Sequence, residues 1–219
     1  MTTIIGTINT NGGPIVWLLL SLSILAMAIT LYKLWQLRYE LRQSHLPQAF
    51  LKHLSAGESS QARLLVQGAK PIRAQVLKHG LDVIEQGKLD ADQSRWELFR
   101  AAKDKLQIVS AYLRPLEIIA TTAPLLGLLG TVLGMIEAFQ AMESAGRSVD
   151  PSVLSGGIWK ALLTTAVGLG VAIPVSVVHS WFERKAEVIG TLLEDDLQRF
   201  FTIVATESAQ VRNENRGVK

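Results

Sequence analysis

Five threonines place hydroxyl groups inside long apolar stretches of this chain. They are Thr121, Thr122, Thr131, Thr164 and Thr165, in stretches that otherwise consist mostly of Leu, Ile, Val, Ala and Gly. A threonine hydroxyl in a helix can bond the carbonyl group four residues earlier, which is a purely local role. It can also line a wet passage and hand on a proton or a hydrated ion. Taken alone, the five hydroxyls favour the local role.

Carboxylates are absent from the middle of these stretches. The ionisable residues closest to the apolar stretches lie near the ends of these stretches, where we expect interfacial rather than conducting positions. They are Glu117, Glu137, Glu143 and His179. A proton path through a membrane needs a titrating group, and ionisable residues at membrane depth mark such paths. If the hydroxyls serve a proton, a partner must supply the acid.

Enzymatic chemistry finds little support in the sequence. The chain has no cysteine and only four scattered histidines, so thiolate metal sites are excluded and no metal-binding spacing is visible. It also lacks a phosphate-binding glycine-rich loop followed by Lys and Ser or Thr. We therefore expect no enzyme, no cofactor and no metal.

Three apolar runs indicate membrane-spanning helices. Residues 15–32, 118–136 and 161–181 form runs of 18, 19 and 21 residues, in a 219-residue chain that is 48% hydrophobic and 19% charged. About 20 helical residues cross a hydrocarbon core of about 30 Å. Backbone groups in lipid must be satisfied within the segment, so we predict an all-α membrane protein with three transmembrane helices. The alternative is a soluble protein with three buried core helices.

Basic residues predict the orientation. Residues 33–114 hold 14 Lys and Arg against 8 Asp and Glu, whereas residues 137–159 hold one Arg and three acids. Positive charges near the spans favour the cytoplasmic side. The N terminus is predicted outside and the C terminus inside.

The resulting segments are predicted as follows: a short external N terminus at 1–14, the first transmembrane helix at 15–34, a cytoplasmic helical region at 35–114, the second transmembrane helix at 115–140, an external loop at 141–158, the third transmembrane helix at 159–182 and a cytoplasmic helical tail at 183–219. Apolar residues at spacings of three, four and seven extend the second and third spans into long cytoplasmic helices. These residues are Trp96, Phe99, Leu106, Val109 and Leu113 before the second span, and Val188, Leu192, Leu197, Phe200 and Val204 after the third. Asp90 and Asp92 are N-cap candidates, and Pro115 predicts a kink at the membrane surface.

Small residues recur at three- and four-residue spacing on one face of each of the last two spans. They are Ala123, Gly127, Gly130 and Gly134 in the second span, and Ala161, Gly168 and Ala172 in the third. Small residues let helix backbones approach closely in lipid, so these faces are predicted packing surfaces.

The two motifs TTAPLLGLLGTVLGMIEAF and GGIWKALLTTAVGLGVAIP, in this order, resemble the MotA/TolQ/ExbB proton channel family, with ExbB-like subunits nearest. The resemblance implies a homopentamer in the bacterial inner membrane, whose second and third spans surround a lumen. There the membrane helices of an ExbD-like partner bring an essential aspartate. Proton flow would drive a TonB-like protein that energises outer-membrane receptors for import.

The resemblance also implies roles for individual residues. The family's lumen threonines fall on Thr131 and Thr165, and we include Thr164 and Thr122 in the expected ion pathway. The family often has a glutamate where this chain has Lys160. That lysine is either an interfacial anchor beside Trp159, or a lumen-mouth residue that repels cations or pairs with a partner acid.

Three alternatives stay open at this stage. The chain could be a TolQ-like subunit serving envelope integrity, a sodium-driven relative, or a non-conducting scaffold for the ExbD-like partner. Hydroxyl groups alone do not choose between H⁺ and Na⁺.

Overall fold

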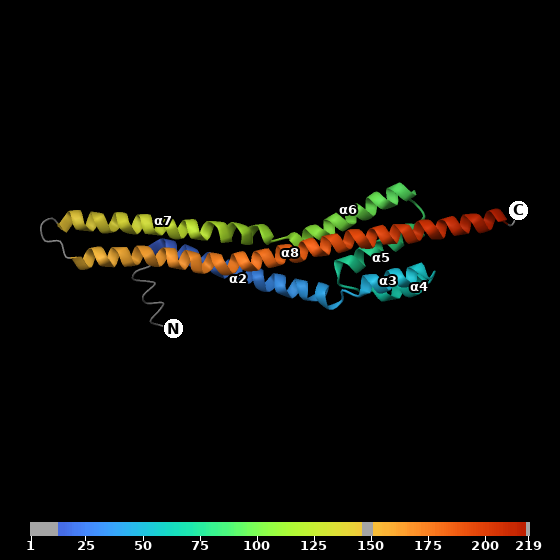
Figure 1. The fold of residues 1–219 in the computed structure, drawn as a ribbon, viewed down its shortest axis with the longest axis horizontal. Helices are drawn as coiled ribbons and strands as arrows, with labels where there is room; N and C mark the ends of the chain where they lie inside the picture. Colours follow the sequence, from blue (N-terminus) through green and yellow to red (C-terminus); the bar gives the residue numbers. More distant parts are fainter. Residues whose placement is uncertain (1–12, 146–150, 218–219) are drawn as a thin grey trace. The chain divides into compact units, whose positions relative to one another are not determined.

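All regular structure in residues 13–145 and 151–217, the part that the computed structural model describes, is helical (Figure 1). The helices are α2 (Gly13–Arg42), α3 (Leu46–Ser55), α4 (Ser59–Val66), α5 (Ile72–Gln86), α6 (Ala91–Ser110), α7 (Leu113–Ala145) and α8 (Pro151–Gly217). Three helical stretches are long and apolar enough to cross a membrane, and they contain the three apolar runs. The predicted all-α class with three such helices is confirmed, and the orientation stays a prediction.

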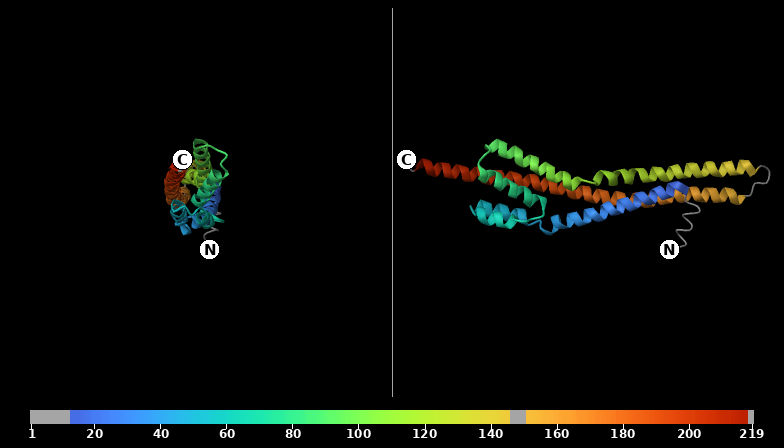
Figure 2. Two further views of the ribbon diagram at one scale, coloured as in Figure 1. Left: turned by 90° about the vertical axis from the view of Figure 1, so that its right-hand side faces the viewer. Right: turned by 180° about the vertical axis from the view of Figure 1, so that it is seen from behind.

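The chain divides into two compact units. The apolar unit comprises Met1–Tyr32 and Tyr112–Phe182, and the bundle unit comprises Lys33–Ala111 and Glu183–Lys219. In the apolar unit, α7 and the first half of α8 lie side by side and antiparallel, as Figure 1 and the right-hand view of Figure 2 show. Helix α7 continues to Ala145 and α8 begins at Pro151, so much of the connection expected at 141–158 is helical. Residues 1–12 of the expected external N terminus and 146–150 of the loop lie outside the described residues.

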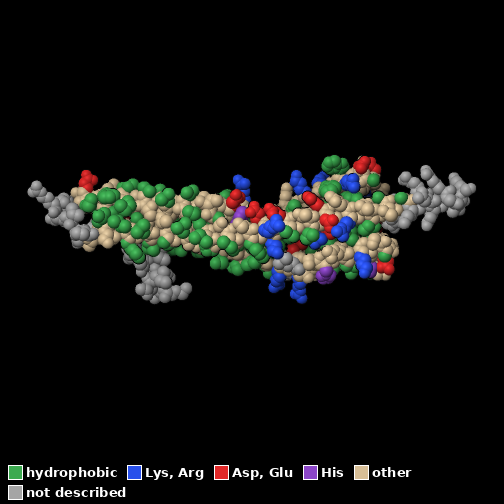
Figure 3. Space-filling model, in the orientation of Figure 1, with side chains coloured by type: hydrophobic (Ala, Val, Ile, Leu, Met, Phe, Trp, Pro, Cys, Tyr) green, Lys and Arg blue, Asp and Glu red, His purple; other side chains and the backbone are tan. Residues whose placement is uncertain are grey.

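Large apolar side chains cover the surface of the apolar unit, as Figure 3 shows on one face. Ile24 is 71% exposed, Val177 66% and Leu125 63%. A surface this apolar would be costly in water, because monomeric soluble proteins keep contiguous apolar patches small. It suits contact with lipid or with further helices.

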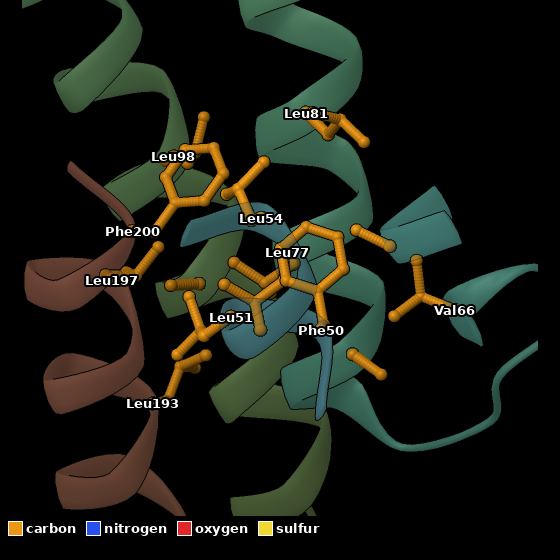
Figure 4. Packing of buried hydrophobic residues seen from close by; sticks show 14 residues of the cluster. Phe50, Leu51, Leu54, Val66, Leu77, Leu81, Leu98, Leu193, Leu197 and Phe200 are labelled. Atoms are coloured by element: carbon orange, nitrogen blue, oxygen red, sulfur yellow. The ribbon is translucent and has the colours of Figure 1, made fainter. Parts of the chain in front are cut away.

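The bundle unit has its own hydrophobic core, shown in Figure 4. Phe50 of α3 and Phe200 of α8 lie fully buried at its centre with ring centroids 6.4 Å apart. The core cluster draws on α3, α4, α5, α6 and α8: Phe50, Leu51, Leu54, Ala62, Val66, Ala74, Val76, Leu77, Leu81, Leu98, Ala102, Leu193, Leu197 and Phe200. The C-terminal half of α8 is therefore packed against the short helices of this unit.

Local sequence signals set the ends of the short helices. Pro47 lies in the first turn of α3, where its missing N–H is not needed. Gly87 ends α5 in the left-handed conformation, with φ of 59°. Asp90 caps α6: its carboxylate accepts from the Gln93 N–H at 2.7 Å, and the Gln93 side chain accepts from the Asp90 N–H at 3.2 Å. The predicted N-cap at Asp90 is confirmed as a capping box.

The chain breaks between α6 and α7, close to the predicted kink. Helix α6 ends at Ser110, α7 begins at Leu113, and Tyr112 between them has φ of 66°. Pro115 explains the break, because it has no N–H for the Ala111 carbonyl and its ring would clash with that carbonyl in a continuous helix. At the third position of α7, where N–H groups have no partner within the helix, the proline is tolerated.

The predicted apolar faces of the two cytoplasmic helical segments are partly wrong. Trp96 is 77% exposed and Phe99 38%, whereas Leu98 and Ala102 carry the buried face of α6. Leucine and alanine at these intervening positions offer a second apolar stripe, and the core selects it. Likewise Val188 and Leu192 are 41% and 38% exposed, and Ile189 and Leu193 are buried in their place. The predicted Leu197 and Phe200 are fully buried.

Candidate functional site

The small residues of α7 and α8 meet along one line, here called the seam. A Cβ atom built on Gly127 would lie 3.0 Å from the Thr164 carbonyl oxygen and 3.0 Å from the Thr165 Cα. One built on Gly168 would lie 2.7 Å from the Ala123 carbonyl oxygen and 3.0 Å from the Gly127 Cα. The backbones are therefore so close that only glycine fits, as expected for small-residue packing in membranes.

The seam continues toward the end of α7 and the start of α8. A Cβ atom on Gly134 would lie 3.0 Å from the Ala161 Cβ, and one on Gly157 would lie 2.4 Å from the Ala138 Cβ. Ala123, Ala161 and Ala172 are also buried. The structure thus brings the residues predicted for helix packing to buried positions on α7 and α8, together with Ala138, which continues their spacing. It adds Gly157, which is partly exposed.

Two of the predicted threonines converge on a single backbone oxygen within the seam. The Thr165 hydroxyl donates to the Gly127 carbonyl at 3.0 Å. The Thr164 hydroxyl lies 3.2 Å from the same oxygen and 2.6 Å from the Ala161 carbonyl oxygen of its own helix. Thr164 is only 4% exposed, whereas Thr165 is partly exposed. Glycine at 130 makes room for Thr164, since a Cβ there would lie 2.4 Å from its hydroxyl oxygen.

The other two predicted threonines bond within their own helix. Thr131 donates to the Leu128 carbonyl at 2.6 Å, and Thr122 donates to the Ile118 carbonyl at 2.7 Å. Both side chains are partly exposed. The structure therefore joins Thr164 and Thr165 at Gly127 and leaves Thr131 and Thr122 outside this contact. A role of the four hydroxyls in an ion pathway stays a prediction.

Lys160 forms an ion pair that the sequence reasoning missed. Its ammonium group lies 2.9 Å from a carboxylate oxygen of Glu137, which ties α8 to α7 near the end of the seam. The side chains are 33% and 63% exposed, respectively. The acid beside Lys160 thus comes from this chain, whereas the sequence suggested an interfacial anchor or a partner's acid. The sequence signal for this ion pair was the opposite charge of Glu137 and Lys160, which lie at similar sequence distances from the connection between α7 and α8.

The sequence of both seam helices falls within a known family. The model for the MotA/TolQ/ExbB proton channel family matches residues 68–195, which is more than half of the 219-residue chain and includes the whole seam. The chain belongs to this family. Family members are transport and channel proteins rather than enzymes. In the described parts of this ExbB-like chain, no three His, Asp or Glu side chains are grouped closely enough to hold a metal ion.

Named relatives support the ExbB-like assignment. The chain is 31% identical to the ExbB-like 3 biopolymer transport protein of Synechocystis sp. over 165 residues, covering 74% of this chain and 77% of the relative. It is 50% identical to the biopolymer transport protein exbB1 of Vibrio cholerae over 76 residues, a third (33%) of each chain. A biopolymer transport protein ExbB of Helicobacter pylori is 40% identical over 74 residues, 34% of this chain and 50% of the relative. These ExbB-like similarities, together with the three apolar helices, identify a multi-pass membrane protein.

Proposed function

We propose that this chain is the proton-conducting subunit of an inner-membrane motor complex. The complex would use the proton motive force to energise a TonB-like protein for import through outer-membrane receptors. The family match and the relatives named as biopolymer transport proteins support this proposal. The observation that carries it is the hydroxyl pair on the seam, placed inside the apolar unit where no carboxylate lies between residues 118 and 136 or 161 and 181.

The hydroxyl geometry suits hydrogen bonding to a protonated acid of a partner. A hydroxyl group has one donor hydrogen and two acceptor lone pairs. Thr165 uses its hydrogen on the Gly127 carbonyl, and its lone pairs remain able to accept from a protonated acid. Thr131 is arranged similarly, with its hydrogen on the Leu128 carbonyl and its side chain partly exposed. These hydroxyls can therefore solvate a proton carrier without titrating themselves.

An ExbD-like partner would supply the missing acid as an aspartate on a membrane helix. Identical copies of this chain, five in the expected ring, would surround that helix through head-to-tail contacts that close around an axis. The exposed apolar side chains of α7 and α8 provide surface for such contacts and for lipid. With the bundle unit on the cytoplasmic side, the protein would reside in the bacterial inner membrane.

One structural observation favours a second candidate, a non-conducting scaffold for the same partner. Both seam hydroxyls already donate to carbonyl groups of this chain, at Gly127 or Ala161. A scaffold needs neither hydroxyl as a proton contact. A TolQ-like role differs from the ExbB-like one in the protein served, and the relatives' names favour ExbB.

Reconstitution in liposomes tests the proposal. The chain and its ExbD-like partner are inserted together, a proton gradient is imposed, and uptake is followed with an internal pH dye. We expect uptake from the complex and none from liposomes with the chain alone. Absence of proton uptake with the assembled complex would favour the scaffold. Activity that requires a sodium gradient would show that the complex uses Na⁺ and not the proposed H⁺.

A further inference from the structure

Helix α2 carries a polar stripe whose side chains all reach other helices. The stripe consists of Lys33, Gln36 and Glu40, which belong to the bundle unit. Spacings of three and four residues place them on one helix face. Leu37 beside them is 6% exposed. This face of α2 therefore packs inward while bearing three polar groups.

The end of α6 lacks a cap of its own. The last four carbonyl groups of a helix have no partner within it, and α6 has no basic residue in its last turn. Lys33 donates to the Val109 carbonyl, and Gln36 donates to the Ile108 carbonyl at 3.4 Å. Two donors from α2 thus serve the last turn of α6, immediately before the break at Ala111 and Tyr112.

Lys33 is an unusual buried cation. Its side chain is 3% exposed, and among the described residues no carboxylate lies within ion-pair distance of its ammonium group. Its polar contacts are the Val109 carbonyl and the Gln36 side-chain oxygen at 3.3 Å. A helix C-terminus carries partial negative charge, which favours a cation there. The partial negative charge at the end of α6 therefore stabilises the Lys33 ammonium group in the absence of a carboxylate partner.

The start of α5 lacks an acceptor for its first N–H groups, whereas the end of α6 lacks donors for its last carbonyl groups. Its N-cap residue is Pro71, which makes no side-chain cap, and its first turn has no acidic residue. Glu40 of α2 accepts from the Ile72 N–H at 2.7 Å. The next residue, Arg73, donates to Asp196 of α8 at 2.7 Å in a pair that is almost fully buried. The first turn of α5 is thus held by α2 on one side and by α8 on the other.

We propose that Lys33, Gln36 and Glu40 form a polar strap, a shared external cap through which α2 holds the last turn of α6 and the first turn of α5. Donors face free carbonyl groups and an acceptor faces a free N–H group, so each contact matches the need of the helix end. Because the three residues lie on one helix, a movement of α2 breaks both caps together. The strap is independent of ion conduction and goes beyond the proposed function.

Backbone hydrogen exchange of the full chain in detergent tests the strap at each end. Lys33→Met removes the donors, and we expect peptides covering residues 105–111 to exchange roughly tenfold faster, the effect of a lost bond to a charged group. Glu40→Met removes the acceptor and should act on residues 72–76. Lys33→Arg and Glu40→Gln keep a donor and an acceptor, respectively, and should stay near wild type. Lys103→Met, an exposed lysine on α6, is the matched control.

The outcomes separate a strap from a general loss of stability. Faster exchange confined to the predicted end, with rescue by the conservative variant, supports the strap. Exchange in Lys33→Met that equals the Lys103→Met control, or that rises equally over the whole chain, overturns it. If Lys33→Met does not fold, Gln36→Ala tests the same end of α6, and wild-type exchange at residues 105–111 in that variant contradicts the proposal.

Discussion

At the scale of single residues, hydrogen bonding separates the threonines of the apolar unit. Thr164 is buried in the seam, and its single hydroxyl hydrogen lies within reach of the Ala161 carbonyl of α8 and the Gly127 carbonyl of α7. Thr165 bonds the same carbonyl as Thr164 but keeps an exposed side. Of the two neighbours, Thr165 is the one that can also contact a partner helix.

The ion pair between Lys160 and Glu137 should contribute little to stability, but placing two like charges at these positions should cost more. Its side chains are 33% and 63% exposed, and exposed pairs are worth about 0.2–1 kcal/mol. We expect Lys160→Met to lower the free energy of unfolding by about that amount. Lys160→Glu should lower it further, because two carboxylates would then lie together.

The exchanged pair is the control. Lys160→Glu combined with Glu137→Lys should restore most of the loss, as measured by thermal unfolding in detergent as a double-mutant cycle. Additive losses in the double variant would show that the two side chains do not interact.

Glu40 should make the stability of the bundle unit depend on pH. Burial raises the pKa of this carboxyl above its ordinary value of 4.5, and the Ile72 N–H and Arg73 lower it without cancelling the rise. The folded chain then binds the proton more tightly than the unfolded chain, so stability is lost as pH rises above 4.5. Glu40→Gln cannot lose a proton.

The free energy of unfolding of Glu40→Gln minus that of wild type should therefore grow as pH rises from 4.5 toward neutrality. Thermal unfolding over a pH series measures this difference. A difference that shrinks over this range would contradict the account of Glu40.

The sequence was sufficient to find most residues of the seam, but not their pairing. Gly127, Thr164 and Thr165 stand out because small and hydroxyl-bearing residues repeat at helical spacing. The convergence of both hydroxyls on one carbonyl depends on the register between two helices, which spacing within one helix does not specify. The pairing of Lys160 with Glu137 depends on the same register.

At the scale of helices, the seam requires close backbone approach at specific glycines. A Cβ at Gly157 would lie 2.4 Å from the Ala138 Cβ, whereas a Cβ at Gly156 meets nothing within 4 Å. We expect Gly157→Ala to lower stability by about 1–3 kcal/mol through overpacking. Gly156→Ala should be neutral or stabilising by up to about 1 kcal/mol, since alanine favours helix.

These adjacent glycines form a matched pair for thermal unfolding in detergent. Adding Ala138→Gly to Gly157→Ala should recover stability by removing the clashing atom. Equal effects of the two single variants would show that α7 and α8 do not approach as described.

The break between α6 and α7 should depend on Pro115. Pro115→Ala supplies an N–H group for the Ala111 carbonyl and removes the ring clash, so residues 111 and 112 can become helical. Tyr112 would also leave its left-handed conformation, which costs a non-glycine residue of order 1–3 kcal/mol. Slower amide exchange at residues 112–116 in the variant would support this cause of the break. Unchanged exchange there would indicate that tertiary contacts impose the break.

Helices were easier to predict from the sequence than their buried faces. The apolar runs, Asp90 and Pro115 indicated where helices lie, cap or break, because these signals are local. Trp96 was predicted to face the core and is 77% exposed, because Leu98 offered a competing stripe and only tertiary packing decides between them. The strap was missed for a similar reason, since Lys33 fits the positive-inside pattern equally well.

At the scale of the whole molecule, composition follows the two units. The apolar unit contains the three apolar runs, whereas most basic residues belong to the bundle unit, including most of the 14 Lys and Arg of residues 33–114. This division is the one expected if, as proposed, the apolar unit lies in the inner membrane and the bundle unit lies in the cytoplasm. The proton-driven role proposed for this protein requires hydroxyl groups of the apolar unit to contact an acid supplied by the partner.

Proton uptake by Thr165 variants tests that role most directly. Complexes with the ExbD-like partner are reconstituted with wild-type chain, Thr165→Val, Thr165→Ser or Thr202→Val, the last altering an exposed hydroxyl of α8 in the bundle unit. After assembly of each complex is verified, we predict wild-type uptake for Thr165→Ser and Thr202→Val. Thr165→Val, which keeps the shape but lacks the hydroxyl, should lose uptake at least tenfold. Wild-type uptake in an assembled Thr165→Val complex would contradict the proposed proton pathway.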